Sequence, residues 1–253
     1  MREGHRIAVV IPALDEERAI GLVVAAIPPW VDAVVVVDNG SVDATAQVAL
    51  AAGAQVVAEP RRGYGAACQA GLAALGDRAG GADIVVFLDG DYSDYPEQMD
   101  RLVDPIVAGR AALVVGSRVK GQVEARALTP VQRFGNWLAT ALIRWRWGVV
   151  YTDLGPFRAV TRTALADLAL ADRDYGWTVE MQARAARRGL AVLEVPVDYR
   201  RRIGVSKISG TLGGSWRAGR KILAVIGAEA LRPAPRRPKT LANPPVAPPD
   251  GPH

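Results

Sequence analysis

The fold class is decided by the stretch Ile84-Val85-Val86-Phe87-Leu88-Asp89-Gly90-Asp91, in which a hydrophobic run ends in two aspartates. The run is typical of a parallel strand that is buried on both faces. Its carboxylates would then emerge at the carboxyl end of the strand, where open α/β sheets bind their ligands. Two acids on one short turn favour a hard divalent cation between them. A solvated turn is the alternative, because aspartate is common in turns.

Short hydrophobic runs alternate with alanine-rich segments through the first half of the chain. Strands are expected at 7–11, 33–37, 55–58, 84–88 and 112–115, and helices at 16–26, 43–52, 65–75 and 97–108. Alternation at this spacing predicts βαβ units, which build a mainly parallel, Rossmann-like sheet with helices on both faces. The expected fold class is therefore α/β.

The second half of the chain has a different pattern. Helices are expected at 131–147, 177–188 and 209–230, an extended segment at 152–160 and a strand at 190–196. Eight of the 17 prolines lie between Pro233 and Pro252, with almost no large apolar residue among them. This composition predicts a single domain over residues 1–230 and a disordered tail at 231–253.

Composition limits the classes of partner and compartment. Half of the 253 residues are hydrophobic, and the net charge of +5 favours anions such as nucleotides, phosphorylated substrates, nucleic acid or an acidic membrane surface. The single cysteine, Cys68, excludes an internal disulfide and fits a reducing compartment. We expect no signal peptide, because the residues before the first strand have no apolar core or cleavage site. No apolar stretch of this sequence reaches the ~18–20 residues of a spanning helix. We therefore expect a cytoplasmic protein that is soluble or peripheral to the inner face of the plasma membrane.

Two common nucleotide-binding classes are excluded by the turn after the first strand. A dinucleotide fold needs Gly-x-Gly-x-x-Gly there, whereas the turn reads Ile11-Pro12-Ala13-Leu14-Asp15-Glu16-Glu17 and has no glycine. The P-loop pattern Gly-x-x-x-x-Gly-Lys-Ser/Thr is also absent. The sequence thus argues against NAD-dependent enzymes and P-loop NTPases.

Several short motifs occur in a fixed order along the chain. In the first half they are Pro12-Ala13-Leu14-Asp15-Glu16, Asp38-Asn39-Gly40-Ser41, Arg62-Gly63-Tyr64-Gly65, Asp89-Gly90-Asp91 and Gly116-Ser117-Arg118. In the second half they are Thr152-Asp153-Leu154-Gly155-Pro156-Phe157-Arg158, Gly176-Trp177-Thr178-Val179-Glu180, Glu194-Val195-Pro196, and Arg202 followed by Ser206-Lys207-Ile208-Ser209. Together they resemble the family 2 glycosyltransferases of GT-A fold, and the second half resembles the dolichol-phosphate mannose and glucose synthase branch. The resemblance covers about residues 6–225.

The resemblance implies that a nucleoside-diphosphate sugar binds where the first strands end. Pro12 and Ala13 would line the base and ribose pocket, and Glu16 would reach the sugar hydroxyls of the nucleoside. Asp15 belongs to the same turn. First-turn acids that are favoured only by the helix dipole are the alternative for Asp15 and Glu16.

Asp38 and Asn39 follow the second strand. A carboxylate at Asp38 accepts hydrogen bonds from the N–H groups of a base. The family commonly has a second acid where this chain has Asn39, which puts a second ionic contact in doubt. A plain Asp-Asn-Gly turn that leads into a helix capped by Asp43 is the alternative.

Two arginines and two glycines mark the third strand–helix junction. Arg61 and Arg62 would attract the donor diphosphate. Gly63 suits a close approach of the backbone to a ligand, and a plain helix-entry turn explains it equally well.

By the same resemblance, Asp89 and Asp91 hold a cation against the two phosphates of the donor. Carboxylate and phosphate oxygens are hard ligands, so Mg²⁺ or Mn²⁺ is expected. Asp91 would be the more direct ligand and Asp89 would reach sugar or ribose, with Gly90 between them. Ser93 and Asp94 follow, and either one could help to bind the metal.

The acceptor side carries Glu180 and several cations. Glu180 would be the general base for an alcohol acceptor. For a phosphate acceptor, which is already largely ionised at neutral pH, it would orient the donor sugar. A helix-start acid without chemistry is the alternative. Arg118, Arg133, Arg202 and Lys207 would surround an acceptor phosphate, with the last two on a loop that closes over the donor.

Two segments combine aromatic, aliphatic and basic residues. Residues 134–147 and 209–230 suit helices that lie in a membrane interface, and ordinary packing onto the sheet is the alternative for each. Nucleic acid is not expected as a partner, because no compact nucleic-acid module is visible.

The sequence therefore predicts a metal-dependent glycosyltransferase. Mannose or glucose would move from a nucleoside-diphosphate sugar to a polyprenyl phosphate, with inversion. The donor-binding half would be 6–118, and the acceptor and membrane-side half 119–230. One competing hypothesis is a GT-A enzyme with a soluble phosphorylated or sugar acceptor, and another is a non-catalytic module that binds nucleotide sugars.

Overall fold

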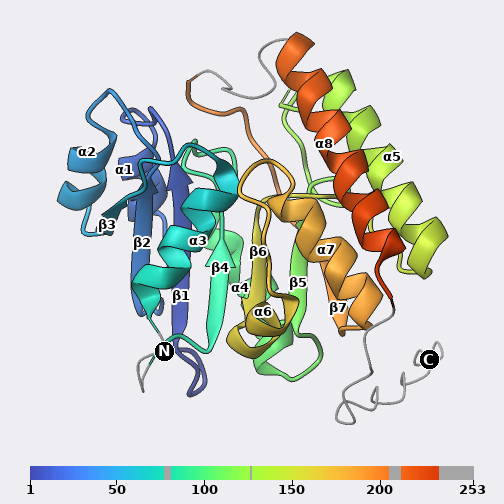
Figure 1. Cartoon of the computed structure of the whole chain (residues 1–253). Helices are drawn as coiled ribbons and strands as arrows, with labels where there is room; N and C mark the ends of the chain where they lie inside the picture. Colours follow the sequence, from blue (N-terminus) through green and yellow to red (C-terminus); the bar gives the residue numbers. More distant parts are fainter. Residues whose placement is uncertain (77–80, 126, 205–211, 234–253) are drawn as a thin grey trace.

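The computed structural model describes residues 1–76, 81–125, 127–204 and 212–233, and within them seven strands form one sheet (Figure 1). The strands are β1 (Ile7–Ala13), β2 (Ala33–Asp38), β3 (Gln55–Ala58), β4 (Ile84–Phe87), β5 (Leu113–Ser117), β6 (Arg158–Thr161) and β7 (Val192–Pro196). Their order is β3-β2-β1-β4-β6-β5-β7. Only β6 is antiparallel to its neighbours in this described sheet. The expected mainly parallel α/β sheet is confirmed.

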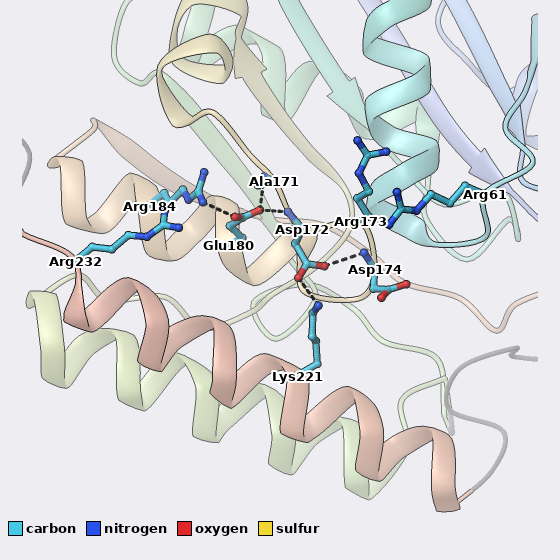
Figure 2. A pocket seen from close by; sticks show the side chains of 9 residues that line it. All are labelled: Arg61, Ala171, Asp172, Arg173, Asp174, Glu180, Arg184, Lys221 and Arg232. Carbon is cyan, nitrogen blue, oxygen red and sulfur yellow. Dashed lines mark hydrogen bonds and ion pairs between the residues drawn. The ribbon is translucent and has the colours of Figure 1, made fainter.

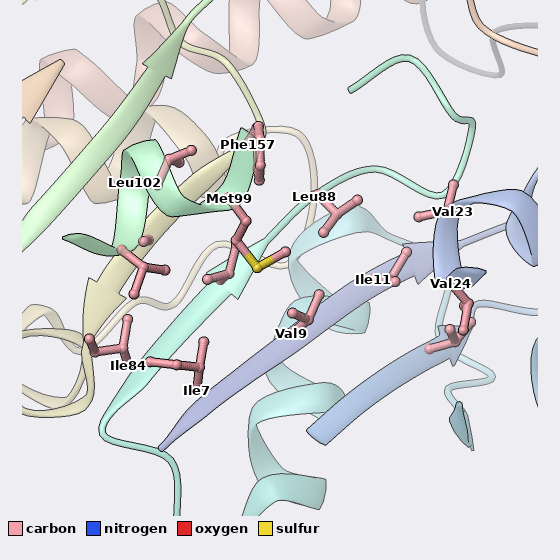
Figure 3. Close-up of a cluster of buried hydrophobic side chains, with 14 of the residues drawn as sticks. Ile7, Val9, Ile11, Val23, Val24, Ile84, Leu88, Met99, Leu102 and Phe157 are labelled. Carbon is pink, nitrogen blue, oxygen red and sulfur yellow. The ribbon is translucent and has the colours of Figure 1, made fainter. Parts of the chain in front are cut away.

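Helices cover both faces of the sheet, as expected. They are α1 (Ile20–Ala25), α2 (Thr45–Ala51), α3 (Tyr64–Leu75), α4 (Met99–Val107), α5 (Pro130–Trp147), α6 (Arg162–Leu168), α7 (Trp177–Arg188) and α8 (Leu212–Leu231), with a 3₁₀ turn at Pro96–Gln98. On one face, α1, α2 and α4 pack around Ile7, Val9 and Ile11 of β1 (Figure 3). On the other, α3, α6 and α7 pack around Val10 of β1 and Val35 of β2. One strand supplies both cores because its side chains alternate between the faces.

Two helices lie outside the layer that covers the sheet. Figure 1 shows α5 and α8 side by side at the edge of the molecule that is remote from β3. Ala139 and Ile143 of α5 and Ile226 of α8 pack with Val179 and Ala186 of α7 in a separate hydrophobic cluster. None of the helices in the described part of the chain is both long enough and apolar enough to cross a membrane.

The structure corrects several element boundaries. The first helix begins at Ile20 rather than at residue 16, because Asp15 has a left-handed backbone (φ 52°) and the Glu16 N–H donates to Thr45 Oγ1 at 2.7 Å. Of the extended segment expected at 152–160, only the part from Arg158 onward is a strand. The sequence pattern did not predict α6, whose seven residues are too few to show a helical period. The helix start expected at 209 and the tail from residue 234 lie outside the described residues.

Candidate active site

The residues predicted to bind the donor lie together at the carboxyl edge of the sheet. β1 is paired in parallel with β2 and β4, so their carboxyl ends meet at one edge. Ala13 is opposite Asp38 in the register, and the turn with Asp89 and Asp91 follows β4 directly. Parallel α/β sheets bind ligands at this edge.

The turn after β4 carries three aspartates in a small space. Asp91 and Asp94 are each 1% exposed, whereas Asp89 is partly accessible. Asp91 Oδ1 accepts hydrogen bonds from the backbone N–H of Ser93 at 2.9 Å and from the Ser93 hydroxyl. Asp91 Oδ2 is paired with the guanidinium of Arg202, and Asp94 Oδ2 accepts the Asp89 N–H at 3.4 Å. The acids are thus held in place largely by their own turn and by one arginine.

Two acids of this turn, Asp89 and Asp94, have raised pKa values. Burial, and next the charge of Asp91, raises the pKa of Asp89 to about 7 against the opposing effects of Arg202 and Arg118. Burial also raises the pKa of Asp94 well above its usual range, and Asp89 and Asp91 add to that rise. Clustered acids with raised pKa values are characteristic of functional sites.

Two buried polar atoms at this turn, and a third beside it at the start of α3, have no hydrogen-bond partner among the described residues. They are the Tyr64 hydroxyl oxygen, Asp89 Oδ1 and Asp94 Oδ1. Such atoms are rare in native proteins, and they fit a position at which a bound ligand completes the hydrogen bonding. The described residues contain no cluster of three or more acidic, histidine or cysteine side chains that could hold a metal alone. One or two carboxylates completed by substrate phosphates are the usual ligands of Mg²⁺, so Asp89 and Asp91 fit a metal that arrives with a diphosphate.

A segment far along the chain clamps this turn. The Arg200 N–H donates to the Ser93 carbonyl and the Ile203 N–H donates to the Asp91 carbonyl, each at 3.0 Å. The Arg200 guanidinium lies over the rings of Tyr92 and Tyr95, 3.4 and 4.1 Å from their centroids, and its Nε donates to the Tyr92 carbonyl at 2.7 Å. Sequence reasoning missed Arg200, although the two tyrosines beside the acids were a possible signal for a cation. These contacts of residues 200–203, which we call the Arg200 clamp, place the Arg202 guanidinium beside the Asp91 carboxylate.

Asp38 and Asn39 organise the neighbouring loops. Asp38 Oδ1 accepts the Ser41 N–H at 2.9 Å. This hydrogen bond closes the Asp-Asn-Gly turn that was expected as the alternative to base binding by Asp38. The Asn39 amide donates to the carbonyls of Glu59 and Arg61 at 2.9 and 2.8 Å, and its oxygen accepts the Gly63 N–H at 2.8 Å. Asn39 therefore ties the end of β2 to the start of α3. Nucleoside binding by either residue stays a prediction.

The turn after β1 is joined to the same loops. Asp15 Oδ1 accepts the Val42 N–H at 2.8 Å, and the Asp15 N–H donates to Ser41 Oγ at 3.0 Å. Glu16 is 9% exposed, and the position of a Cβ on Gly204 would be 3.8 Å from Glu16 Oε2. The segment that clamps the aspartate turn thus also reaches the first turn. The nucleoside contacts expected of Asp15 and Glu16 stay predictions.

Backbone contacts within the protein explain three of the glycines. A Cβ on Gly63 (φ 145°) would lie 2.2 Å from the Arg173 carbonyl oxygen, and one on Gly65 would lie 2.1 Å from that of Asp172. A Cβ on Gly90 would be 3.3 Å from the Pro12 carbonyl oxygen. The glycines at the third junction therefore make room for the backbone of the loop 171–174, and a close approach of a ligand to Gly63 stays a prediction. Arg62 donates to the Gly40 carbonyl at 3.2 Å, which directs it toward the β2 turn.

Glu180 is held by the protein on both carboxylate oxygens. Glu180 Oε2 accepts the N–H groups of Ala171 and Asp172 at 3.0 and 2.8 Å, and Oε1 is paired with Arg184 at 2.6 Å. In this state the residue positions the loop over α3. Its predicted roles, as a base or on the donor sugar, stay predictions.

Glu180 lines an open pocket of about 460 Å³ (Figure 2). The other lining residues are Arg61, Ala171, Asp172, Arg173, Asp174, Arg184, Lys221 and Arg232. Asp89 and Asp91 do not line it, and most of its charges are paired, as in Lys221 with Asp172 at 2.8 Å. The carboxyl-edge turn is therefore the better candidate for the chemistry.

Arg118 is placed by a carboxylate from the loop before β6. Its Nε and an η nitrogen donate to the two oxygens of Asp153 at 2.8 and 2.7 Å, and its guanidinium lies 5.0 Å from the ring centroid of Tyr199. Tyr199 also bridges to Asp94, so Arg118 is adjacent to the aspartate turn. Arg133 is exposed on α5, and Lys207 lies outside the described residues.

Comparisons with known proteins identify the family of this chain. Residues 8–169 match the model of the glycosyl transferase family 2. The chain is 40% identical over 213 residues to an uncharacterized glycosyltransferase of Mycobacterium tuberculosis, covering 84% of this chain and 94% of the relative. It is 34% identical over 230 residues to the dolichyl-phosphate hexose transferase of Haloferax volcanii, covering 89% and 96%.

A solved structure supports the same assignment. Glucosyl-3-phosphoglycerate synthase from Mycobacterium tuberculosis, in complex with Mn²⁺, UDP-glucose and phosphoglyceric acid, matches with a TM-score of 0.71 and 29% identity over 91% of this chain and 81% of that one. The family match covers most of the sheet, and the relatives align over nearly the whole chain. This chain therefore belongs to glycosyl transferase family 2 and is a glycosyltransferase of the GT-A fold.

Proposed function

We propose that this glycosyltransferase moves mannose or glucose from a nucleoside-diphosphate sugar to a polyprenyl phosphate, with inversion at the anomeric carbon. The observation that carries the donor part is the set of unpartnered buried oxygens at Asp89, Asp94 and Tyr64. The acceptor part is supported by the dolichyl-phosphate hexose transferase of Haloferax volcanii, which aligns over almost its whole length.

Asp89 and Asp91 would hold Mg²⁺ or Mn²⁺ against the donor diphosphate. When bound, the metal supplies charge that stabilises the departing nucleoside diphosphate. Mn²⁺ together with UDP-glucose in a structural neighbour supports this role. The Arg200 clamp keeps the turn in one geometry, so the two carboxylates do not need to reorganise when the donor binds.

Arg118 and Arg202 would bind the acceptor phosphate. Both are next to the aspartate turn, and Arg offers paired donors that match phosphate oxygens. A phosphate oxygen that is already ionised attacks without a general base. Glu180 would then act by positioning the loop 171–174, whose backbone N–H groups it accepts. Arg133 and Lys207 belong to the same predicted acceptor set.

The domain division is part of the same proposal. Residues 1–230 would form one catalytic domain, with donor binding in 6–118 and acceptor binding in 119–230. One sheet contains strands from both parts, which supports a single domain.

A soluble phosphorylated acceptor is the second candidate. The observation that favours it is the likeness to glucosyl-3-phosphoglycerate synthase, whose complex contains phosphoglyceric acid. Both candidates share the donor, the metal and the arginines, and they differ only in the group to which the acceptor phosphate is attached.

Two measurements test the proposal in sequence. Thermal shifts with UDP-, GDP- and dTDP-sugars, each with Mn²⁺ or with EDTA, identify the donor, because a ligand of the folded state raises apparent stability. Transfer from that donor is then compared for a short-chain polyprenyl phosphate and for 3-phosphoglycerate. Transfer to the polyprenyl phosphate supports the proposal, and transfer only to 3-phosphoglycerate assigns the second candidate. No shift with any donor would overturn both.

A further inference from the structure

One surface of the molecule is not used by the site described above. α5 buries Ala139, Thr140 and Ile143 against its neighbours. Its other side exposes Phe134, Trp137 and Trp145, with exposed fractions of 61, 62 and 83%. These positions are separated by three and eight residues and fall on one side of a helix, opposite the buried stripe. We call Phe134, Trp137 and Trp145 the aromatic face.

Basic residues accompany the aromatic face. Arg133 and Arg144 are exposed on α5, and the sequence of α5 contains no acidic residue. The neighbouring α8 exposes Arg220, and the one acid in the sequence of α8 is Glu229. Glu229 is 2% exposed and is paired with Arg184 at 2.8 Å, so it contributes little negative charge to the surface. In its described part, the α5–α8 layer therefore combines exposed aromatic rings with exposed arginines.

This charge pattern selects the occupant. In a dimer about a two-fold axis, the same patch faces itself, so the arginines of α5 would lie against the arginines of a second copy. Like charges brought together in this way oppose pairing. An anionic lipid surface complements both features, because tryptophan and phenylalanine enter the headgroup region while arginines contact anionic lipids.

The aromatic face is also connected to the acceptor arginine. Asn136, one residue from Trp137, donates to the Thr152 carbonyl at 2.9 Å and accepts the Leu154 N–H at 2.7 Å. Between these two residues is Asp153, which holds Arg118. The helix turn that bears part of the aromatic face therefore supports the loop that positions Arg118.

We infer that the aromatic face of α5 docks the enzyme onto an anionic bilayer surface, which brings Arg118 to the level of the lipid headgroups. This inference rests on the proposed function, because a polyprenyl phosphate acceptor is anchored in such a surface. Docking occurs in the plane of the interface and requires no spanning helix.

Flotation of the full chain with vesicles tests the inference. The wild type is expected to float with vesicles of phosphatidylcholine and phosphatidylglycerol, and to float less with phosphatidylcholine alone or at high salt. Trp137→Ser with Trp145→Ser should lower the bound fraction about tenfold, since the apolar insertion is lost. Arg144→Gln should lower it about fivefold. The matched control is Val42→Ser with Leu50→Ser, which changes residues that are 88 and 65% exposed near α2 and should leave binding unchanged.

The outcomes separate this inference from the proposed function. Absence of flotation by the wild type, or equal loss in the control pair, would overturn the docking inference. A dimer in light scattering that Trp137→Ser with Trp145→Ser converts to monomer would assign the face to a second copy. The same samples are tested for Mn²⁺-dependent thermal stabilisation by the nucleotide sugar that the thermal-shift screen identifies as the donor. None of these substitutions should alter that stabilisation. Stabilisation without flotation refutes only the docking, whereas flotation without stabilisation refutes only the donor assignment.

Discussion

The guanidinium of Arg202 is ion-paired with Oδ2 of Asp91 across 111 residues of sequence. The other oxygen of Asp91 is engaged by Ser93 within the same turn, whereas the Arg202 side chain is 32% exposed and has room to move. A metal ion that binds Asp91 Oδ2 must therefore displace Arg202. The displaced arginine would then be available to an incoming phosphate.

The first prediction concerns this exchange. Arg202→Met should raise the affinity of the donor-free protein for Mn²⁺ by about tenfold, the size of effect that one adjacent charge has on a pKa. Titration calorimetry with Mn²⁺ alone measures it. Arg201→Met is the control, because Arg201 donates to the Ala125 carbonyl and does not contact the acids in the described structure. Equal or weaker Mn²⁺ binding by Arg202→Met would show that the two cations do not compete.

The second prediction concerns Asp91 in transfer. Asp91→Asn keeps the shape of the side chain and an acceptor for Ser93 but removes the charge that a metal needs. Transfer should fall by at least about a thousandfold, which corresponds to the several kcal/mol that a bound metal supplies. Initial rates and circular dichroism melting are measured on the same preparation. Asp167→Asn, an exposed acid on α6, should keep the wild-type rate. A folded Asp91→Asn variant with normal turnover would refute the metal role.

The third prediction concerns pH. The pKa of Asp89 is raised to about 7 from its ordinary value of 3.8, so between these values the folded protein holds a proton that the unfolded chain has lost. Stability of the metal-free protein should therefore fall as the pH rises from about 4 to about 7. Asp89→Asn should lose this part of the pH dependence. Urea denaturation of both proteins at several pH values measures the difference, and parallel curves would contradict the assignment.

The same titration has a consequence for metal binding. Because the metal requires the ionised carboxylate, its apparent affinity should rise by about tenfold per pH unit below pH 7 and then level off. Mn²⁺-induced thermal shifts at pH 6 and pH 8 would show it. A shift that is larger at pH 6 would be the contrary result.

The fourth prediction concerns the junction of β3 and α3. Gly63→Ala forces a Cβ into the Arg173 carbonyl at a backbone angle that only glycine adopts easily, so unfolding free energy should fall by about 2–4 kcal/mol. Gly109→Ala is the matched control, because Gly109 also has a positive φ (68°) but its Cβ would meet nothing within 4 Å. Its cost should be about 1 kcal/mol. An equal loss of unfolding free energy in Gly63→Ala and Gly109→Ala would mean that the loop 171–174 moves away from the new Cβ without strain.

Local pattern was sufficient for most of the fold. The boundaries of β3 and α7 were predicted to the residue, because a short β-branched run and a charged amphipathic helix each end at a glycine or a polar residue. The predicted start of α1 was wrong because the Asp15 N–H donates to Ser41 and the Glu16 N–H donates to Thr45, 26 and 29 residues away, and such contacts leave no local signal. The same limit explains why residues before Arg158 form a loop, since Asn136 and Glu194 bind their backbone.

The sequence predicted which residues belong to the candidate site, but it did not predict which of their side chains contact one another. The order of Asp89, Asp91 and Arg118 along the chain indicated acids and cations at one edge. Arg202 contacts Asp91, and Arg200 lies over the rings of Tyr92 and Tyr95. Both contacts form only because the chain comes back to the aspartate turn from residue 199 onward. A single sequence does not specify which of many arginines makes that contact.

The antiparallel strand β6 has a consequence for how the chain is made. β4 pairs with β1 on one side and with β6 on the other, and β5 is joined to the rest of the sheet only through β6 in the described structure. A chain that ends before residue 158 would leave the apolar β4 as a bare edge, which invites aggregation. During synthesis the first half should therefore wait for β6 before its sheet can close, and an isolated fragment of residues 1–150 should be insoluble.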